Sequence, residues 1–361
     1  MSIHVETPVG VDAFTEFLNF HDVVYESHSA RWTTFLPLEL PILTGESPFA
    51  RGRRIRPFWA RQSGKTVARV LAVLDERYQR HWNEKLGHTL MFEALPGTRE
   101  AVKKLMDEAC DWLAKQGAEA ARAGYGMVEF PFAIDAYDVL PPPFVRHTPA
   151  YYHSLLKDAG FESERGWVDY KIRVRPELVA RWESALEAVT RAGYRMVTLA
   201  ELEPARRTKI FTEVWNECFA FHWGYTPFIA DEVELVFASL ESSGTLETSL
   251  LAYQGDEPVG ALWVVPDLSM SAETAPGREI RDEEKLNLLG IGVCKAARGR
   301  GVNLAMAAAS YLKLARRGAR YLSYTLVLDD NWPSRRTGEK LGGEVCANYV
   351  VYRRNFRRNR R

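Results

Sequence analysis

The sequence lacks the features that would place it in a membrane or in a secretion pathway. No apolar run approaches the ~18 residues of a membrane span. The opening MSIHVETPVGVD has no basic segment followed by an apolar one, so it does not read as a secretion signal. We therefore expect a cytoplasmic protein with no membrane partner.

Cysteine pairs and an excess of one charge are also missing. The four cysteines, Cys110, Cys218, Cys294 and Cys346, form no CxxC pair, so we expect no metal site and no redox dithiol. Lys and Arg total 47, as do Asp and Glu, and this balance argues against a nucleic-acid partner. Only the tail is biased: six of its last nine residues are Arg, which predicts a solvated end or contact with an acidic partner.

What is present is a repeated order of elements. At 361 residues with 46% hydrophobic and 26% charged residues, the chain is long enough for two soluble α/β domains, each with a mixed sheet. A hairpin, strand, helix, strand, helix and strand are expected at 58–75, 89–93, 100–116, 125–130, 151–159 and 168–174. After a strand at 194–199 and a helix at 204–219, the same order is expected at 249–265, 286–293, 302–317, 321–328, 334–341 and 345–353. The linker is expected within 175–193, giving domains 1–175 and 176–361.

The segment with the clearest chemistry is the turn Arg298-Gly299-Arg300-Gly301. It follows a buried strand and opens a long helix. The first turn of a helix has N–H groups without partners and carries partial positive charge, so it favours phosphate. Glycine lets the backbone approach a bulky anion, and arginine adds charged hydrogen bonds. The turn predicts a pyrophosphate site; an exposed strand-to-helix turn with two surface arginines is the plain alternative.

Two motifs together resemble the Gcn5-related N-acetyltransferase (GNAT) superfamily. The first is Arg-x-x-Gly-x-Gly/Ala between a strand and a helix, which residues 298–303 match except that Asn303 replaces the small residue. The second is a strand, then Asn331, then a helix ending in Lys340-Leu341-Gly342, where Gly343 replaces the usual Phe. The N-terminal half resembles the same fold in degenerate form, because Pro96-Gly97-Thr98 opens its helix.

The resemblance implies two tandem GNAT-like domains with one acyl-coenzyme A site, in the C-terminal copy. The acyl donor is expected to be acetyl-CoA or another acyl-CoA. The pantetheine arm would pair with the strand backbone, the turn amides would hold the pyrophosphate, and the second motif would lie beside the thiol. The coenzyme-binding residues implied are Ile291, Gly292, Val293, Arg298, Gly299, Arg300, Gly301, Val302, Asn303 and Asn331.

The catalytic groups follow the family less closely. Many members use a Tyr in the second motif to protonate the leaving thiolate, but Gly338 stands at that position. Ser334 or Tyr352 could replace it, and Glu284, just before the central strand, is the candidate base. Proximity alone could also supply much of the acceleration.

The acceptor pocket is expected in the aromatic stretch that follows the 204–219 helix. Gly224 and Pro227 make this stretch less helical, so its aromatic side chains are better candidates for a pocket than for a helix core. The predicted substrate-binding residues are His222, Trp223, Tyr225 and Phe228.

Three functions fit these observations. The first is an acyl-CoA-dependent N-acyltransferase that acts on a small-molecule amine or amino acid. The second is a non-catalytic acyl-CoA or metabolite binding protein, consistent with the missing Tyr. The third is a Fem-like aminoacyl transferase, which the tandem copies favour and the intact pyrophosphate turn disfavours. A homodimer, the acyl chain length and the acceptor's identity are left open.

Overall fold

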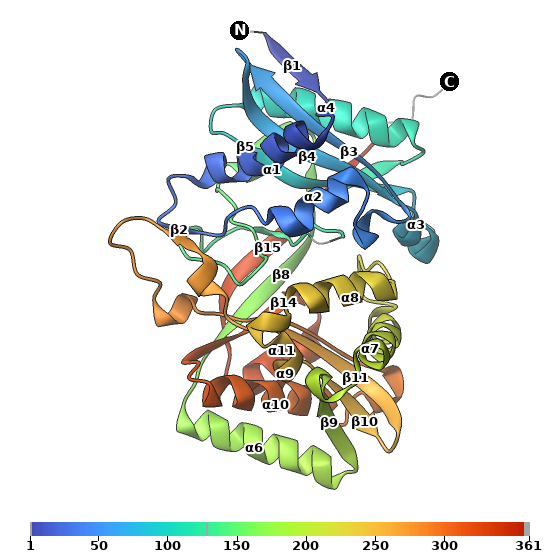
Figure 1. Ribbon diagram of the computed structural model, residues 1–361, viewed down its shortest axis with the longest axis vertical. Helices are drawn as coiled ribbons and strands as arrows, with labels where there is room; N and C mark the ends of the chain where they lie inside the picture. The colour runs from blue at the N-terminus through green and yellow to red at the C-terminus, as the bar shows by residue number, and fades with distance from the viewer. Residues whose placement is uncertain (1, 128, 357–361) are drawn as a thin grey trace.

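A computed structural model describes residues 2–127 and 129–356 (Figure 1). The last five arginine-rich tail residues, 357–361, lie outside this range. The N-terminal half contains, in chain order, β1 (Ile3–Glu6), α1 (Val11–Tyr25), β2 (Ala30–Arg31), α2 (Leu36–Thr44), β3 (Arg53–Gln62), β4 (Lys65–Asp75), α3 (Glu76–Trp82), β5 (Leu86–Ala94), α4 (Arg99–Lys115), β6 (Ala120–Ala123), β7 (Phe132–Ala133), α5 (Tyr152–Asp158) and β8 (Glu162–Arg173).

The C-terminal half continues with a second set of helices and strands. It contains α6 (Pro176–Arg191), β9 (Tyr194–Thr198), α7 (Pro204–Phe219), α8 (Ala230–Ser239), α9 (Thr245–Thr248), β10 (Leu250–Gln254), β11 (Glu257–Val265), β12 (Glu273–Thr274), β13 (Leu288–Val293), α10 (Val302–Arg316), β14 (Tyr321–Leu328), α11 (Trp332–Lys340) and β15 (Glu344–Asn355).

The two halves share one sheet. Its strand order is β1-β3-β4-β5-β6-β15-β8-β14, with β7 paired to β15 at the side. The last strand of the chain, β15, therefore lies between β6 and β8 of the N-terminal half, and β8 lies between β15 and β14 of the C-terminal half. Each half thus completes the sheet of the other. A domain boundary at 175/176 stays a prediction, because this sheet runs through both sides of it.

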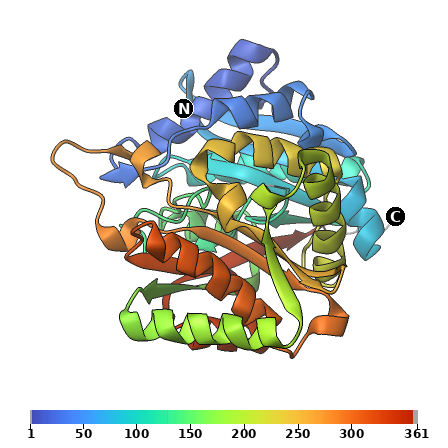
Figure 2. The same ribbon diagram turned by 60° about the horizontal axis from the view of Figure 1, so that its bottom comes forward.

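Helices cover the sheets of both halves (Figure 2). In the N-terminal half, the apolar stripe of α4 packs on β3 and β4 with Val102, Leu105 and Met106 fully buried. In the C-terminal half, α10 packs on β10, β11 and β13, and α6 packs on α10. The expected linker is therefore a helix of the core: Trp182 of α6 is buried, and its indole N–H donates to Leu341 O at 3.1 Å.

The remaining strands of the C-terminal half form a separate sheet, β13-β11-β10-β9. Between β13 and β14 the described residues form no backbone ladder. Two side chains join these strands instead. The amide of Asn287 donates to Ser323 O at 3.0 Å and accepts from Ser323 N at 2.9 Å, and the hydroxyl of Thr325 bonds to Leu289. The two strands consequently part beyond Leu289, which leaves one edge of β13 free.

Most elements predicted from the sequence are confirmed, including β9, α7, the β10–β11 hairpin, β13, α10, β14 and α11. The strand predicted at 125–130 is wrong: the strand is β6, at 120–123. Gly124 and Gly126 both have positive φ, which ends the extended backbone there. Residues 124–127 and 129–131 therefore lie outside the sheet strands, and Tyr125 contacts Trp223 of the C-terminal half.

Candidate functional site

The turn before α10 has the backbone that an anion site requires. Gly299 and Gly301 have φ of 78° and 80°, a region that side chains with a Cβ rarely adopt. Among the described residues, the N–H groups of 299–303 donate no hydrogen bond to the protein. The first turn of α10 carries no acidic side chain. Unpaired amides at a helix N-terminus beside Arg300 suit a phosphate group.

The corresponding turn of the N-terminal half differs in charge. The helix α4 begins after Thr98, whose hydroxyl donates to Leu95 O at 2.6 Å. Its first turn contains Glu100, and Arg99 is paired with Asp158. A carboxylate at this place opposes a phosphate.

The free edge of β13 begins at the pyrophosphate turn. Neighbouring residues of a strand point their N–H and C=O groups to opposite edges. Since Leu289 bonds to Thr325 and Cys294 N donates to Val259 O, the backbone of Ile291 faces the free edge. The N–H and C=O groups of Ile291 thus lie on the edge of β13 that pairs with no strand among the described residues. Val293 O on the same edge is already taken by Arg298 Nε at 2.9 Å.

Glycine in β13 lets the helix α7 approach the strand. A Cβ at Gly290 would lie 2.6 Å from the Trp215 ring, and one at Gly292 would lie 2.6 Å from Cys218 Cβ. Cys218 Sγ is also 3.3 Å from Cys294 Sγ. The helix α7, which carries Trp215, therefore forms one wall beside the free edge of β13.

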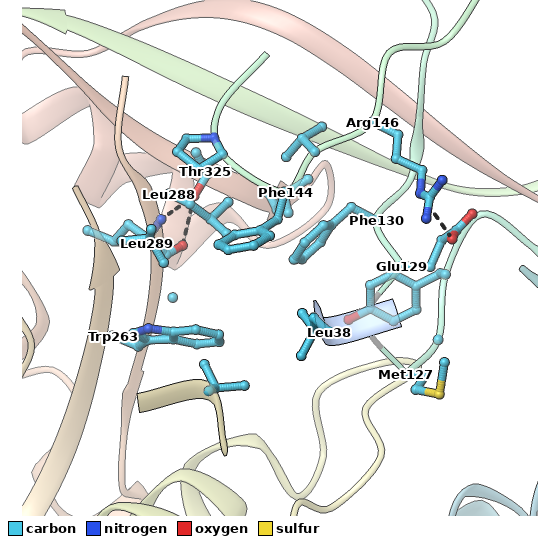
Figure 3. Close-up of a pocket in the computed structure, with 18 of the residues that line it drawn as sticks. Leu38, Met127, Glu129, Phe130, Phe144, Arg146, Trp263, Leu288, Leu289 and Thr325 are labelled. Carbon is cyan, nitrogen blue, oxygen red and sulfur yellow. Dashed lines mark hydrogen bonds and ion pairs between the residues drawn. The ribbon is translucent and has the colours of Figure 1, made fainter. Parts of the chain in front are cut away.

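A cavity of about 580 Å3 lies between the two halves and reaches β13. Its central walls are apolar and come from both halves: Leu38, Phe130 and Phe144 from one, and Trp263, Leu288 and Leu289 from the other (Figure 3). The volume is that of a site for a whole small molecule, which is typically about 300–1,000 Å3. The cavity thus extends from β13 towards the N-terminal half with an apolar central section.

A phenol and a hydroxyl meet on the cavity wall. Tyr324 Oη and Ser334 Oγ are 2.9 Å apart, and both residues line the cavity. Burial raises the pKa of Tyr324 to about 12, so this phenol keeps its proton. Sequence reasoning identified Ser334 but missed Tyr324, because a Tyr inside a strand looks like any core residue.

The missing Tyr at Gly338 has a packing explanation. A Cβ at Gly338 would lie 3.1 Å from the Tyr170 ring. Tyr170 is buried, and its hydroxyl accepts from Arg335 Nε at 3.1 Å. A large side chain at 338 would have to displace this ring.

His222 faces the same cavity as a neutral imidazole. Burial lowers its pKa to about 4. Its Nδ1 lies 3.4 Å from Trp223 O, and Nε2 has no hydrogen-bond partner among the described residues. Tyr225 and Phe228 also line the cavity. Trp223 does not line it: its ring packs between Arg122, Tyr125 and Trp167.

Two predicted catalytic residues, Tyr352 and Glu284, do not line the main cavity. Tyr352 is buried in the N-terminal core, where its hydroxyl is 2.8 Å from His153 Nδ1. Glu284 is paired with Arg278 and Arg281 and lines a smaller cavity instead.

Two asparagines predicted to bind the coenzyme, Asn331 and Asn303, have local hydrogen-bond partners. Asn331 lines the main cavity and caps α11 by accepting Ser334 N at 3.3 Å. Asn303 donates to Thr337 Oγ1 at 2.8 Å, which joins α10 to α11. The Asn that replaces the family's small residue thus has a structural partner, and its backbone N–H stays available.

The chain has a distant relative among known proteins, although no family model matches it. A protein of Caulobacter vibrioides called bacterial ceramide synthase is 22% identical over 330 residues, which cover 85% of each chain. In the part of the chain that the structure describes, no helix is long and apolar enough to cross a bilayer.

Solved structures share the whole fold. A tandem GNAT protein from the clavulanic acid biosynthesis pathway matches with a TM-score of 0.58 and 13% identity, covering 98% of both chains. A fungal multi-domain β-N-acetylglucosaminidase with a GCN5-related glucosamine N-acetyltransferase region also matches at 0.58, with 16% identity, but this chain spans only 38% of it. The chain therefore has the tandem fold of the GCN5-related N-acetyltransferases, as its two motifs predicted.

Proposed function

We propose that the chain is an acyl-CoA-dependent N-acyltransferase whose acceptor is an amine with a long apolar body. The observation that carries this proposal is the continuity of three features: the turn before α10, the free edge of β13 and the cavity between the two halves. The amide-rich turn at Gly299–Asn303 leads to the free edge at Ile291, and that edge opens into an apolar cavity of about 580 Å3. A coenzyme bound along this path would direct its acyl group into the cavity.

The size and lining of the cavity favour a large apolar substrate over an acetyl group with a small polar acceptor. Burying each methylene contributes about 0.8 kcal/mol, so a cavity lined by Phe144, Trp263 and Leu288 selects for hydrocarbon. The relative in Caulobacter is called a ceramide synthase, and a ceramide is by definition an amide of a long-chain amino alcohol. The relative's name and the cavity thus support the same class of acceptor.

The residues of the cavity have the chemistry that amide formation needs. Acyl-CoA supplies the thioester, and the turn amides, Arg300 and the Ile291 backbone would hold it. His222 lines the cavity and is neutral at neutral pH because burial lowers its pKa, and under this proposal it would take the proton of the acceptor amine. The Tyr324–Ser334 pair is the proton donor on the wall for the leaving thiolate.

The test is a thiol-release assay with acetyl-, dodecanoyl- and palmitoyl-CoA against dodecylamine, glycine and spermidine. We expect release with dodecylamine and a long-chain donor, and little with glycine or spermidine. Preference for acetyl-CoA with glycine or spermidine would contradict the proposal. Binding of acyl-CoA without release from any amine would favour the non-catalytic alternative.

A pair of variants connects the activity with the cavity. Phe144→Asp places a charge in the apolar central part of the cavity, and it should reduce turnover of dodecylamine by on the order of 100-fold. Aspartate tolerates the positive φ of 66° at this position better than most residues. Phe221→Asp makes the same change at a side chain that is 91% exposed, and it should leave turnover unchanged. Equal loss in both variants would remove the cavity from the explanation.

A further inference from the structure

The cavity ends in charged groups on the side of the N-terminal half. Glu129 and Arg146 form this end, and the apolar section of Leu38, Phe130 and Phe144 separates them from Leu289 on β13 (Figure 3). A ligand that reaches from β13 to this end therefore crosses the apolar section before it meets Glu129 and Arg146.

Arg146 is surrounded by three carboxylates. Its guanidinium lies 2.7 Å from Glu39, 3.3 Å from Glu93 and 3.7 Å from Glu129. The side chains of Glu93 and Glu129 are only 1% and 5% exposed. Buried charges of this kind persist in folded proteins when each has a partner.

One of the three carboxylates is less well compensated than the others. Glu93 has His21 Nδ1 at 2.8 Å, Arg69 at 3.9 Å and the hydroxyl of Tyr152 at 2.6 Å in addition to Arg146. Among the described residues, the Glu129 carboxylate has Arg146 and the backbone N–H of Met91 as its partners. Burial accordingly raises the pKa of Glu129, whereas the pKa of Glu93 falls to about 2 because its charged partners outweigh its burial.

The two carboxylate oxygens of Glu129 differ in their hydrogen-bond partners. Oε2 accepts the Met91 N–H at 3.0 Å and is also the atom nearest to Arg146. Oε1 has no hydrogen-bond partner among the described residues, although the carboxyl is almost fully buried and lines the cavity. Oε1 is not one of the fully buried unpaired atoms, so it is open to the cavity that Glu129 lines, and it can accept a hydrogen bond from a ligand without displacing a protein donor.

We propose that Glu129 Oε1 binds a second polar group of the acceptor, an ammonium or a hydroxyl, at the end of the apolar chain remote from the reacting amine. This inference rests on the proposed function for the identity of the reacting end. It specifies the acceptor class as a chain with a hydrogen-bond donor at each end. The spacing of the two donors is then set by the apolar section between Glu129 and β13.

The first test is binding, measured by calorimetry with the full chain in the absence of acyl-CoA. The ligands are 1-aminoalkanes, α,ω-diaminoalkanes and ω-amino alcohols with eight to sixteen carbons. For the two bifunctional series we expect a sharp optimum of chain length, with binding on the order of 10- to 100-fold tighter than the simple amine of that length. The simple amines should strengthen steadily with length. The two bifunctional series distinguish an ammonium from a hydroxyl at Glu129.

The second test uses Glu129→Gln, whose amide oxygen can still accept the Met91 N–H. It should abolish the advantage of the diaminoalkanes, because an amide N–H in the place of Oε1 cannot accept from an ammonium, and it should leave the simple amines unchanged. Glu46→Gln is the matched control, because Glu46 is solvent-exposed. An advantage of the diaminoalkanes that survives in Glu129→Gln would overturn the proposal.

The wild-type series decides the matter even where the variant does not fold. Bifunctional ligands that bind no better than simple amines at any length overturn the subsite, whatever the enzyme activity. A length optimum without thiol release would instead keep the subsite and refute the proposed function.

Discussion

The hydroxyl of Thr325 on β14 makes two hydrogen bonds to Leu289 on β13, accepting its N–H and donating to its C=O, each at 2.8 Å. One side chain thus takes the place of a backbone ladder at the point where the two strands part. Beyond it, the edge of β13 at Ile291 is free for a ligand. The Thr325–Leu289 contact therefore marks the point on β13 beyond which the strand edge is free.

Thr325→Val should lower the free energy of unfolding by about 1–3 kcal/mol, because it keeps the shape but leaves two buried backbone groups unpaired. Thr190→Val is a matched control: its hydroxyl bonds back to Leu186 O on the exposed face of α6, so the change should stay within about 0.5 kcal/mol. Urea unfolding measures both. Equal stability of the two variants would show that the bridge contributes nothing.

Alanine variants of the two arginines in the turn should differ in their effects on protein stability and on coenzyme A binding. Arg298 donates to Val293 O and Cys218 O, whereas the side-chain contact of Arg300 is a long one of 3.4 Å to Tyr194. Arg300→Ala should weaken coenzyme A binding on the order of tenfold with an unchanged melting temperature. Arg298→Ala should lower both. Calorimetry and thermal unfolding measure the two effects, and unaltered affinity in both variants would argue against the pyrophosphate site.

One coenzyme should bind per chain. In the N-terminal half, Glu100 lies in the first turn of α4 and the Met91 N–H on β5 is occupied by Glu129. Neither the charge nor the strand edge suits a second acyl-CoA there. A calorimetric stoichiometry of two would contradict this prediction, and loss of the single site in Arg298→Glu/Arg300→Glu would place it in the C-terminal half.

The sequence predicted local features better than distant ones. The turn at Gly299–Gly301 and the helix that follows were predictable because glycine, arginine and an alanine-rich stripe each have a direct structural meaning. The place of β15 between β6 and β8 was not, because pairing partners in a shared sheet leave no local pattern. Glu129 and Tyr324 were missed for the same reason: their importance arises only when both halves meet at the cavity.

His222 should act as a base without itself titrating in the working range. Its pKa of about 4 keeps the imidazole neutral above pH 5. His222→Ala should reduce kcat by on the order of 100-fold with little change in coenzyme affinity. The exposed His4 is the control, and His4→Ala should have no effect. Thiol release across pH 5–9 measures this, and full activity of His222→Ala would assign the base elsewhere.

Asp169 on β8 should make stability fall as pH rises. Its carboxyl is buried and accepts the N–H of Leu326 and, at 2.9 Å, the hydroxyl of Tyr349, yet burial dominates and raises its pKa from 3.8 to about 7. Between these two values the folded chain keeps a proton that the unfolded chain has lost. The contribution of Asp169 to stability is therefore greatest below pH 4 and declines until about pH 7.

Asp169→Asn removes this titration but keeps an oxygen that can accept the Leu326 N–H. The free energy of unfolding of the variant, relative to wild type, should consequently rise from pH 4 to pH 7 and then level off. Asp256→Asn, at an exposed turn, controls for the loss of a carboxylate and should show no such trend. Urea unfolding at each pH measures the difference. A difference that stays constant with pH would mean that Asp169 has the same pKa in the folded and unfolded chain, and that its burial is fully compensated by Leu326 and Tyr349.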